Sequence, residues 1–382
     1  MQVRWVLEDA SRPGGVESVV RTLNEGLCER GVDSTVLSWL PPVERPGRGS
    51  VLSWFRVRAA EARRRSRAAR SAAAELARDL ASDPDLVVLL DPGSLSVARH
   101  LRGLPRWGVH MHWSPDLILR PWRYTGGDGV PPLLVLLVRA RLAWVGFGNR
   151  RVLGGAPFLV TLTPSHTRQL GRIQGAITEV SNPVAFGTPS PRPEPGPVVT
   201  LGYVGRLAWE KGPDVLMDAL SGGDGVLAGT ELLVAGSGPL DEDIRARAQP
   251  VASTPTTFLG WVADPWDVLE RVDVIVLPSR SEGVPLVLVE ALAAGCLVVA
   301  AEAGSGVRDV LADGRLGRIV PVGDHLAQRE AMSAAVSDVR AHRRNDPDLV
   351  RETVERHSLE NVLDRWVALL ADLTARRDVP RN

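Results

Sequence analysis

The chain has 382 residues, and its 45 lysines and arginines balance 45 aspartates and glutamates, which gives a formal net charge of zero. This length favours two domains over a single core, and the charge balance argues against a general nucleic-acid-binding protein. The two cysteines form no disulfide framework and have no metal-site spacing. The N-terminus lacks the basic start and the long apolar region of a signal peptide, so we expect a cytoplasmic protein.

The first half of the chain alternates between short β-branched runs and segments with helical periodicity. Strands are predicted at residues 3–7, 32–37, 86–90, 108–111 and 158–161. Helices are predicted at residues 16–30, 55–80 and 133–153. This alternation predicts a parallel sheet with helices on both faces.

The second half shows the same alternation. Strands are predicted at residues 199–204, 231–235, 257–259, 272–277, 297–301 and 318–320. Helices are predicted at residues 213–220, 240–248, 265–271, 285–294 and 307–311, with a final amphipathic helix at residues 359–370. A second parallel sheet is therefore expected.

The fold class predicted from these patterns is α/β, with two Rossmann-like domains that each contain a doubly wound parallel sheet. We place the first domain at residues 1–187 and the second at residues 198–358. Residues 188–197 are rich in proline and predict a semi-rigid linker. We expect the C-terminal segment, residues 359–382, to pack back on the first domain.

Two carboxylates lie eight positions apart in the stretch PSRSEGVPLVLVE, residues 278–290. A buried strand is predicted directly before it, and Gly283 and Pro285 predict a loop that leads into a helix. Glu282 is therefore expected at the carboxyl end of the strand, and Glu290 about one and a half turns into the helix. Ligands bind at this edge of an open α/β sheet, where each acid can accept hydrogen bonds from hydroxyl groups of one ligand.

Two basic residues, Arg206 and Lys211, follow another predicted strand in the stretch GYVGRLAWEKGP, residues 202–213. A planar guanidinium and a compact ammonium on one side suit a diphosphate. A second glycine-rich strand end, VAGSGP at residues 234–239, contains Gly236. We favour phosphate binding over the alternative, a solvated loop with ordinary surface charges.

Two further features lie at strand ends in the first half. Gly14 and Gly15 follow the first strand and begin a helix, where glycines let a phosphate or an acceptor approach the backbone. The alternative is a simple turn. His110 and His112 end a predicted strand and, two residues apart, point to the same side. Two histidines without a third ligand do not indicate a metal site.

In combination these motifs resemble a known enzyme family. The second-half series consists of GR at residues 205–206, KG at 211–212, AGSGP at 235–239, FLGWV at 258–262 and the stretch from 278 to 290. It is similar to the C-terminal domain of retaining glycosyltransferases of the glycogen-synthase-like GT-B superfamily, in family four. The resemblance covers roughly the whole chain, since the segments at residues 13–17, 163–165 and 180–184 are similar to first-domain segments of that family.

The resemblance implies two GT-B domains that face a central cleft, and a role for each of these positions. Arg206 and Lys211 would bind the donor diphosphate and neutralise the charge that grows on the leaving group. Glu282 would contact hydroxyls of the transferred sugar, and His112, rather than His110, would also reach the sugar; the alternative is a structural histidine. Further donor contacts are implied for the ribose-binding Glu290, for Gly14, Gly15 and Gly236, and for the backbone at Gly283, Val284, Pro285 and Leu286.

The implied activity is transfer of a hexose from a UDP or GDP sugar to an acceptor hydroxyl, with retained anomeric configuration and no metal or other cofactor. The acceptor would be a small molecule, a glycan or a lipid-linked glycan of a bacterial cell envelope or of secondary metabolism. Three alternatives stay open: an inverting GT-B transferase with His112 as its base, a nucleotide-sugar epimerase of the same fold, and a non-catalytic nucleotide-binding module.

The stretch that begins at Arg56 and ends at Arg70 is a basic helical segment behind Trp54 and Phe55. Such a helix can lie on an anionic membrane and bring an enzyme to a lipid acceptor. The alternative, which the sequence favours, is a solvated arginine-rich helix face.

Overall fold

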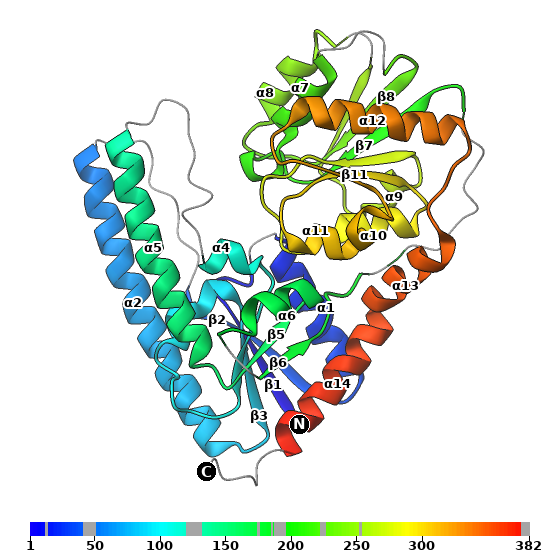
Figure 1. Cartoon of the computed structure of the whole chain (residues 1–382). Helices are drawn as coiled ribbons and strands as arrows, with labels where there is room; N and C mark the ends of the chain where they lie inside the picture. Colours follow the sequence, from blue (N-terminus) through cyan, green and yellow to red (C-terminus); the bar gives the residue numbers. More distant parts are fainter. Residues whose placement is uncertain are drawn as a thin grey trace. The chain divides into compact units, whose positions relative to one another are not determined.

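The computed structural model describes residues 1–11, 14–40, 51–119, 132–173, 176–184, 186, 196–221, 227–251 and 254–375, without the side chains of residues 51–60, 117 and 132–139. The chain divides into two compact units, which Figure 1 shows coloured along the sequence: Met1–Pro183 with Val362–Asn382, and Val184–Asn361. Of the linker predicted at residues 188–197, all but residues 196 and 197 lie outside the described residues.

The first unit is built on a six-stranded parallel sheet with the order β2-β1-β3-β4-β5-β6. Its strands are β1 (Gln2–Leu7), β2 (Asp33–Ser38), β3 (Leu86–Leu90), β4 (Trp107–His110), β5 (Phe158–Thr161) and β6 (Ile177–Glu179). Because β2 and β3 lie on opposite sides of β1, the strand order reverses between β1 and β3. Open α/β sheets form their ligand crevices at such a point.

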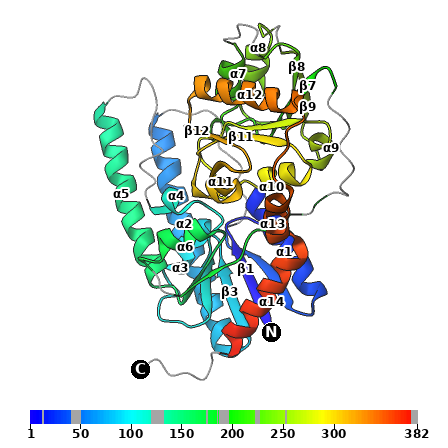
Figure 2. The same ribbon diagram turned by 45° about the vertical axis from the view of Figure 1, so that its right-hand side comes forward.

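Helices cover both faces of this sheet. They are α1 (Gly15–Glu29), α2 (Val51–Ser82), α3 (Leu95–Ala98), α4 (Pro115–Leu119), α5 (Pro132–Gly154), α6 (Pro164–Leu170) and the C-terminal α14 (Leu359–Ala375). Figures 1 and 2 show the long helices α2 and α5 side by side and α1 next to α14. A Cβ on Gly26 of α1 would lie 2.4 Å from Leu363 of α14, so glycine permits this close packing.

The two faces of the first sheet have separate apolar cores. All five residues of β3 are buried, as expected for a central parallel strand. One core contains Ala69, Ala73 and Leu76 of α2. On the opposite face, Trp5 packs edge-on against Trp366 of α14, with ring centroids 5.0 Å apart.

The second unit contains another six-stranded parallel sheet, with the order β12-β11-β10-β7-β8-β9. Its strands are β7 (Val199–Val204), β8 (Thr230–Ala235), β9 (Thr256–Gly260), β10 (Val274–Leu277), β11 (Leu297–Ala301) and β12 (Arg318–Val320). After β9 the chain returns to the other side of β7, so the order reverses between β7 and β10. This is the strand order of dinucleotide-binding Rossmann sheets.

Figure 1 shows α7, α8 and α12 on one face of this sheet and α9, α10 and α11 on the other. The helices are α7 (Pro213–Ser221), α8 (Asp241–Ala248), α9 (Trp266–Leu269), α10 (Leu286–Ala293), α11 (Ser305–Val310), α12 (His325–Arg340) and α13 (Pro347–His357). Met217 of α7 and Met332 of α12 are buried in one apolar core with Leu201 and Val276 of the sheet.

The predicted fold class is confirmed, and each predicted strand and helix is present; β3, β5, β7, β11 and β12 have the predicted bounds, and the other elements have shifted ends. The sequence patterns missed β6, α3, α4, α6, α12 and α13. Four of these six elements span at most seven residues, too few to show a period. In α12 the buried residues include Gln328 and two small alanines, so its apolar face is weakly marked.

Candidate functional site

The carboxyl ends of β7 and β10 lie side by side where the order of the second sheet reverses. The loop after β7 contains Arg206 and ends in a 3₁₀ turn, Trp209–Lys211. The loop after β10 begins at Pro278 and contains Glu282. Loops that are distant in the sequence therefore meet at the sheet edge where ligands bind.

Lys211 and Glu282 form an ion pair between these two loops. The Nζ atom of Lys211 lies 2.8 Å from Oε1 and 3.0 Å from Oε2 of Glu282. The Ser279 hydroxyl donates to the same Oε1 over 2.6 Å, and the Glu282 amide donates to the carbonyl of Ala303 over 3.0 Å. The Glu282 side chain is only 7% exposed, so the ammonium and the hydroxyl compensate a buried carboxylate.

Arg206 lies on the same loop as Lys211 and is more accessible. Its guanidinium pairs with Glu210 and remains 65% exposed. The Tyr203 hydroxyl donates to the Arg206 carbonyl over 2.9 Å, which fixes the backbone at this point. Burial raises the pKa of Tyr203, and the nearby Glu282 and Glu210 carboxylates raise it further. The structure therefore gathers Arg206, Lys211 and Glu282 at one sheet edge.

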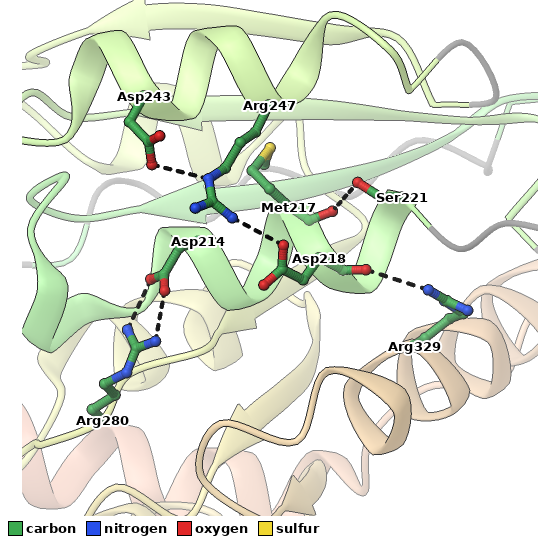
Figure 3. A network of polar contacts seen from close by, with 8 residues as sticks. All are labelled: Asp214, Met217, Asp218, Ser221, Asp243, Arg247, Arg280 and Arg329. Atoms are coloured by element: carbon green, nitrogen blue, oxygen red, sulfur yellow. Dashed lines mark hydrogen bonds and ion pairs between the residues drawn. The ribbon is translucent and has the colours of Figure 1, made fainter. Parts of the chain in front are cut away.

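Arg280 binds the loop after β10 to helix α7 (Figure 3). Its two terminal nitrogens donate to the two carboxylate oxygens of Asp214 over 2.8 and 2.6 Å. This is a bidentate pair, the strongest geometry for an arginine and a carboxylate. Burial alone would raise the pKa of Asp214, but the hydrogen bonds and the charge of Arg280 lower it.

Arg280 also contacts the 3₁₀ turn that carries Lys211. Its Nη1 donates to the Trp209 carbonyl over 2.8 Å, and its guanidinium lies 4.9 Å from the centroid of the Trp209 ring. Its backbone amide donates to the Glu210 carbonyl over 2.9 Å. Arg280 is therefore a positioning residue that fixes the turn of Lys211 against the loop of Glu282.

The polar network continues along α7 to α8 and α12 (Figure 3). Arg247 of α8 donates to Asp243 over 2.9 Å and to Asp218 of α7 over 3.0 Å. Arg329 of α12 donates to the carbonyls of Ala219 and Asp218 over 2.6 and 3.3 Å. These pairs are more exposed than the Arg280 pair, and exposed ion pairs contribute little individually.

Glycines permit the backbones around the site to approach one another. A Cβ on Gly212, which has a φ of +64°, would lie 2.1 Å from the Pro278 carbonyl oxygen. A Cβ on Gly236, with a φ of +142°, would lie 1.9 Å from the Gly205 carbonyl oxygen. The Gly236 amide donates to the Gly260 carbonyl over 2.6 Å, so this glycine has a packing role, and its contact with a donor stays a prediction.

Gly283, Val284 and Pro285 lead directly into α10, which begins at Leu286. A Cβ on Gly306 would lie 2.0 Å from the Gly283 carbonyl oxygen, so the start of α11 packs closely on this stretch. The first amides of a helix have no partner within it and suit an anionic ligand. Donor contacts with this backbone stay a prediction.

Glu290 lies on α10, and its side chain is half-buried. Burial raises the pKa of Glu290 to about 7, and the neighbouring Asp264 carboxylate adds to this shift. The group is therefore close to half-ionised at neutral pH. Its expected contact with a ribose stays a prediction.

In the first unit, Gly14 and Gly15 lie at the start of α1, after β1. Gly14 has an extended backbone that other residues also adopt, and a Cβ there would meet only the flexible Glu17 side chain. No described atom lies within 4 Å of a Cβ built on Gly15. The space beside Gly15 is therefore open to a ligand. The backbone conformations of Gly14 and Gly15 do not themselves require glycine.

His110 is the last residue of β4 and His112 lies two residues further on, and their rings are in contact. Their ring centroids are 3.9 Å apart, and His110 also packs edge-on against Trp366 at 5.0 Å. Burial lowers the pKa of His112 to about 3, although the Asn182 side chain partly opposes this shift. Burial and the neighbouring His112 lower the pKa of His110 as well. Both imidazoles are therefore neutral at pH 7.

Sequence motifs did not identify Ser279, Arg280 or Asp214 as site residues, although Ser279 and Arg280 lie inside the quoted stretch. Asp214 lies 66 residues from Arg280, so no local pattern connects them. The sequence contained one further indication that position 211 needs an ammonium group: Lys211 is the only lysine among 45 lysines and arginines. Within the described residues, no group of three or more histidines, cysteines or acids is placed to bind a metal ion.

Comparisons with known proteins bear on the family of the chain. Residues 198–338 match the family model described as "Glycosyl transferases group 1", and residues 14–183 match "Glycosyl transferase 4-like domain". The chain is 30% identical over 253 residues to lipopolysaccharide 1,6-galactosyltransferase of Escherichia coli K12, a match that covers 61% of this chain and 68% of that protein. It is 32% identical over 199 residues to phosphatidyl-myo-inositol mannosyltransferase of Mycobacterium leprae, which covers 46% of this chain and about half, 52%, of that protein.

Among solved structures, the fold is similar to that of Anabaena HepE in complex with UDP and glucose. The TM-score is 0.65 at 16% sequence identity, and the match covers 97% of this chain and 100% of that chain. The chain belongs to the group 1, family-4-like glycosyltransferases, and its two parallel sheets are those of the GT-B fold. It is an enzyme of the type that uses nucleotide sugars.

Replacing Arg280 with lysine should loosen the turn that carries Lys211. A lysine keeps the charge but loses the bidentate pair and the stacking, so we expect the free energy of unfolding to fall by about 1–2 kcal/mol. We also expect nucleotide affinity to fall about tenfold. Calorimetric titration and urea unfolding measure the two effects.

Arg247→Lys is the matched control, since Arg247 belongs to the same network but contacts neither loop. It should leave nucleotide affinity at the wild-type value. A positioning role for Arg280 is wrong if Arg280→Lys lowers stability while its nucleotide affinity equals that of wild type.

Replacing Glu290 with glutamine should stabilise the ligand-free protein at alkaline pH. The folded pKa of about 7 lies above the ordinary value of 4.5, so the wild type loses stability as the pH rises from 4.5 to 7. Glutamine removes that loss. We expect a gain of about 3 kcal/mol at pH 8 and none at pH 4, measured by thermal unfolding.

Glu242→Gln on α8 is the control, because Glu242 is exposed. It should change stability at neither pH. Parallel stability–pH curves for wild type and Glu290→Gln would contradict the assignment of a raised pKa to Glu290.

Proposed function

We propose that this enzyme moves a hexose from a UDP or GDP sugar to an acceptor hydroxyl with retention of the anomeric configuration. The acceptor belongs to a bacterial cell-envelope glycan or to a secondary metabolite. The observation that supports this most directly is the ion pair between Lys211 and Glu282 where the strand order reverses, with the accessible Arg206 on the same loop.

The hydrogen-bond capacity of this pair suits a nucleotide sugar. An ammonium has three hydrogens, and Lys211 directs two hydrogen bonds to Glu282. One hydrogen remains for a phosphate oxygen. The carboxylate has about four acceptor positions, of which Lys211 and Ser279 use three. The remaining position can accept a hydroxyl of the transferred sugar.

Charge on the leaving diphosphate grows as the bond from the anomeric carbon to the phosphate oxygen breaks. The Lys211 ammonium and the Arg206 guanidinium are cations that can stabilise this charge. We therefore propose that the reaction needs no metal ion, because these two side chains provide the positive charge. The departing phosphate oxygen takes the proton of the acceptor hydroxyl as the new glycosidic bond forms on the same face of the sugar.

The properties of His112 support retention over inversion. An inverting enzyme needs a base that deprotonates the acceptor, and the best base has a pKa near the working pH. Burial lowers the pKa of His112 to about 3, so its imidazole is a weak base. As a neutral ring it can still exchange a hydrogen bond with the sugar.

The relatives indicate the classes of donor and acceptor. The Escherichia coli protein is named a lipopolysaccharide galactosyltransferase and the Mycobacterium leprae protein a phosphatidyl-myo-inositol mannosyltransferase, and galactose and mannose are both hexoses. The Anabaena structure contains UDP and glucose. These names support a hexose donor and an envelope acceptor for this chain, with UDP and GDP as the two candidate nucleotides.

A panel of UDP and GDP sugars should identify the donor by thermal shift, since a specific ligand raises the apparent stability.

Lys211→Ala should lower turnover by about a hundredfold, because it removes a cation that acts on the leaving group. Glu290→Ala should mainly weaken donor binding. Proton NMR of the product should show the anomer of the donor.

Wild-type transfer rates in both variants would overturn the assignment of the donor site. An inverted product would establish the alternative that uses a base. Conversion of the free nucleotide sugar without acceptor would establish an epimerase, and donor affinity without acceptor-dependent release of nucleotide would establish a binding module.

We also propose peripheral contact with an anionic membrane through α2 and α5, which lie side by side in both views (Figures 1 and 2). The residues of α2 with described side chains include the exposed Arg63, Arg67 and Arg70. On α5, Trp144 is 75% exposed and Phe147 is 58% exposed. Aromatic and basic side chains together suit the interface of an anionic bilayer. Among the described helices, none has the length and apolarity to cross a bilayer.

Vesicle sedimentation tests this contact. The protein should sediment with phosphatidylglycerol vesicles and not with phosphatidylcholine vesicles, because the attraction of basic residues needs anionic lipid. Arg63→Gln, Arg67→Gln and Arg70→Gln combined, or Trp144→Ala with Phe147→Ala, should each reduce binding. Trp261→Ala is the control, since Trp261 is 73% exposed on the second unit. Equal sedimentation of all variants would refute the contact.

A further inference from the structure

A cavity of about 420 Å³ lies in the first unit between α2, α3 and α5. Pro92 and Gly93, which follow β3, line one side of it together with Ser96 and Arg99. We call it the Arg99 pocket. Its volume falls within the range of roughly 300–1,000 Å³ that is usual for small-molecule sites.

The Arg99 pocket lies at the carboxyl edge of the first sheet. Arg65 of α2 lines it and donates to both carboxylate oxygens of Glu8 over 3.0 and 2.6 Å. Glu8 directly follows β1, and Gly93 belongs to the segment after β3. The pocket therefore lies beside the ends of the two strands between which the order reverses, the usual place of a ligand in such a sheet.

The lining of the Arg99 pocket is cationic. It contains Arg65, Arg99 and His100, and among the described residues that line it none is acidic. Glu8 compensates the charge of Arg65. Arg99 is exposed, and its Nη2 would lie 3.5 Å from a Cβ on Gly148, so its guanidinium extends across the pocket towards α5.

The Ser96 hydroxyl provides an independent indication of a ligand. In the part of the chain that the structure describes, its Oγ is buried without a hydrogen-bond partner, and Ser96 lines the pocket. A buried polar group without a partner costs about 1–3 kcal/mol. The neighbouring Asp91 does not line the pocket, and it accepts hydrogen bonds from the Gly93 amide and the Ser94 hydroxyl.

We propose that the Arg99 pocket binds a phosphate group, as a monoester or diester, carried by the acceptor. This inference rests on the proposed transferase function, because it identifies the acceptor of that reaction. Phosphate oxygens accept hydrogen bonds from the Arg99 guanidinium, the His100 ring and the Ser96 hydroxyl, and a guanidinium matches phosphate geometry.

The size and the apolar part of the lining indicate more than a free ion. Pro92 and Leu95 line the pocket beside the polar groups. A phosphate alone leaves most of the volume empty, whereas a glycerol or a sugar ring attached to the phosphate fills it against these side chains. The ligand class is therefore a phosphate ester of a polyol, which occurs both in soluble sugar phosphates and in lipid headgroups.

The test uses the full-length protein labelled with lysine that carries 15N at the α-nitrogen, so that a single backbone amide signal reports Lys211, the only lysine. NMR first shows which nucleotide, UDP or GDP, shifts the Lys211 signal, and sn-glycerol 3-phosphate is then titrated by calorimetry in the presence of that nucleotide. We expect sn-glycerol 3-phosphate to bind without moving the Lys211 signal in the NMR spectrum. Arg99→Ala should weaken this binding at least ~tenfold, and Ser96→Ala should weaken it less.

Arg102→Ala is the matched control, since Arg102 is also exposed but does not line the pocket. It should bind sn-glycerol 3-phosphate as the wild type does, and glycerol should not bind. Dihexanoyl phosphatidylglycerol, below its micelle concentration, distinguishes the two sources of the phosphate. Tighter binding than that of sn-glycerol 3-phosphate indicates a lipid headgroup, and equal or weaker binding indicates a soluble phosphate ester.

Three results would overturn the proposal: no binding of either phosphate ester, equal affinity in Arg99→Ala and wild type, or a shift of the Lys211 signal by sn-glycerol 3-phosphate without nucleotide. The donor site is judged separately, because the response of Lys211 to UDP or GDP does not involve the Arg99 pocket. If neither nucleotide moves that signal, the proposed function fails, and the titration without nucleotide still decides whether the pocket binds phosphate.

Discussion

A carboxylate that is 7% exposed needs a cation beside it, and Lys211 supplies one to Glu282. The two residues lie 71 positions apart, on the loops after β7 and β10. Their contact depends on these strands being neighbours, which holds only because the sheet order reverses between them. The ion pair therefore depends on the topology of the second unit. A compact ammonium suits this position, because it satisfies both oxygens of Glu282 and keeps one hydrogen for a ligand.

Glycines and one arginine make this arrangement rigid. Gly212 lets the loop after β7 approach the loop after β10, and Gly306 lets the start of α11 approach that same loop, to distances that any Cβ would prevent. Arg280 then connects Asp214 and the turn of Lys211 to the loop of Glu282 through a bidentate pair, backbone hydrogen bonds and stacking. The charges that would contact a diphosphate are thus oriented before a ligand arrives, which is the condition for effective electrostatic stabilisation of a transition state.

Local sequence patterns predicted the strands and helices whose residues show a clear apolar run or period. Buried strands such as β3 and β10 consist of short apolar runs, and the order of strands and helices followed from them. Motifs with glycine and proline placed Lys211 and Glu282 at strand ends. Partners that meet only through the tertiary fold were not predictable: Asp214 is 66 residues from Arg280, and the Arg99 pocket is formed where three helices converge. Short elements such as β6 have too few residues to show a period.

Burial acts in opposite directions on the two kinds of titratable group near the sheet edges. It raises the pKa of Glu290 to about 7 and lowers that of His112 to about 3, because in each case the neutral form is favoured. His112 is therefore suited to exchanging hydrogen bonds with a sugar and unsuited to removing a proton. The charges available for chemistry belong to groups that are accessible or paired, namely Arg206, Lys211 and Glu282. Two cations and a paired acid in the second unit, together with a histidine of the first unit that is too weak to act as a base, support our proposal that the leaving phosphate accepts the proton.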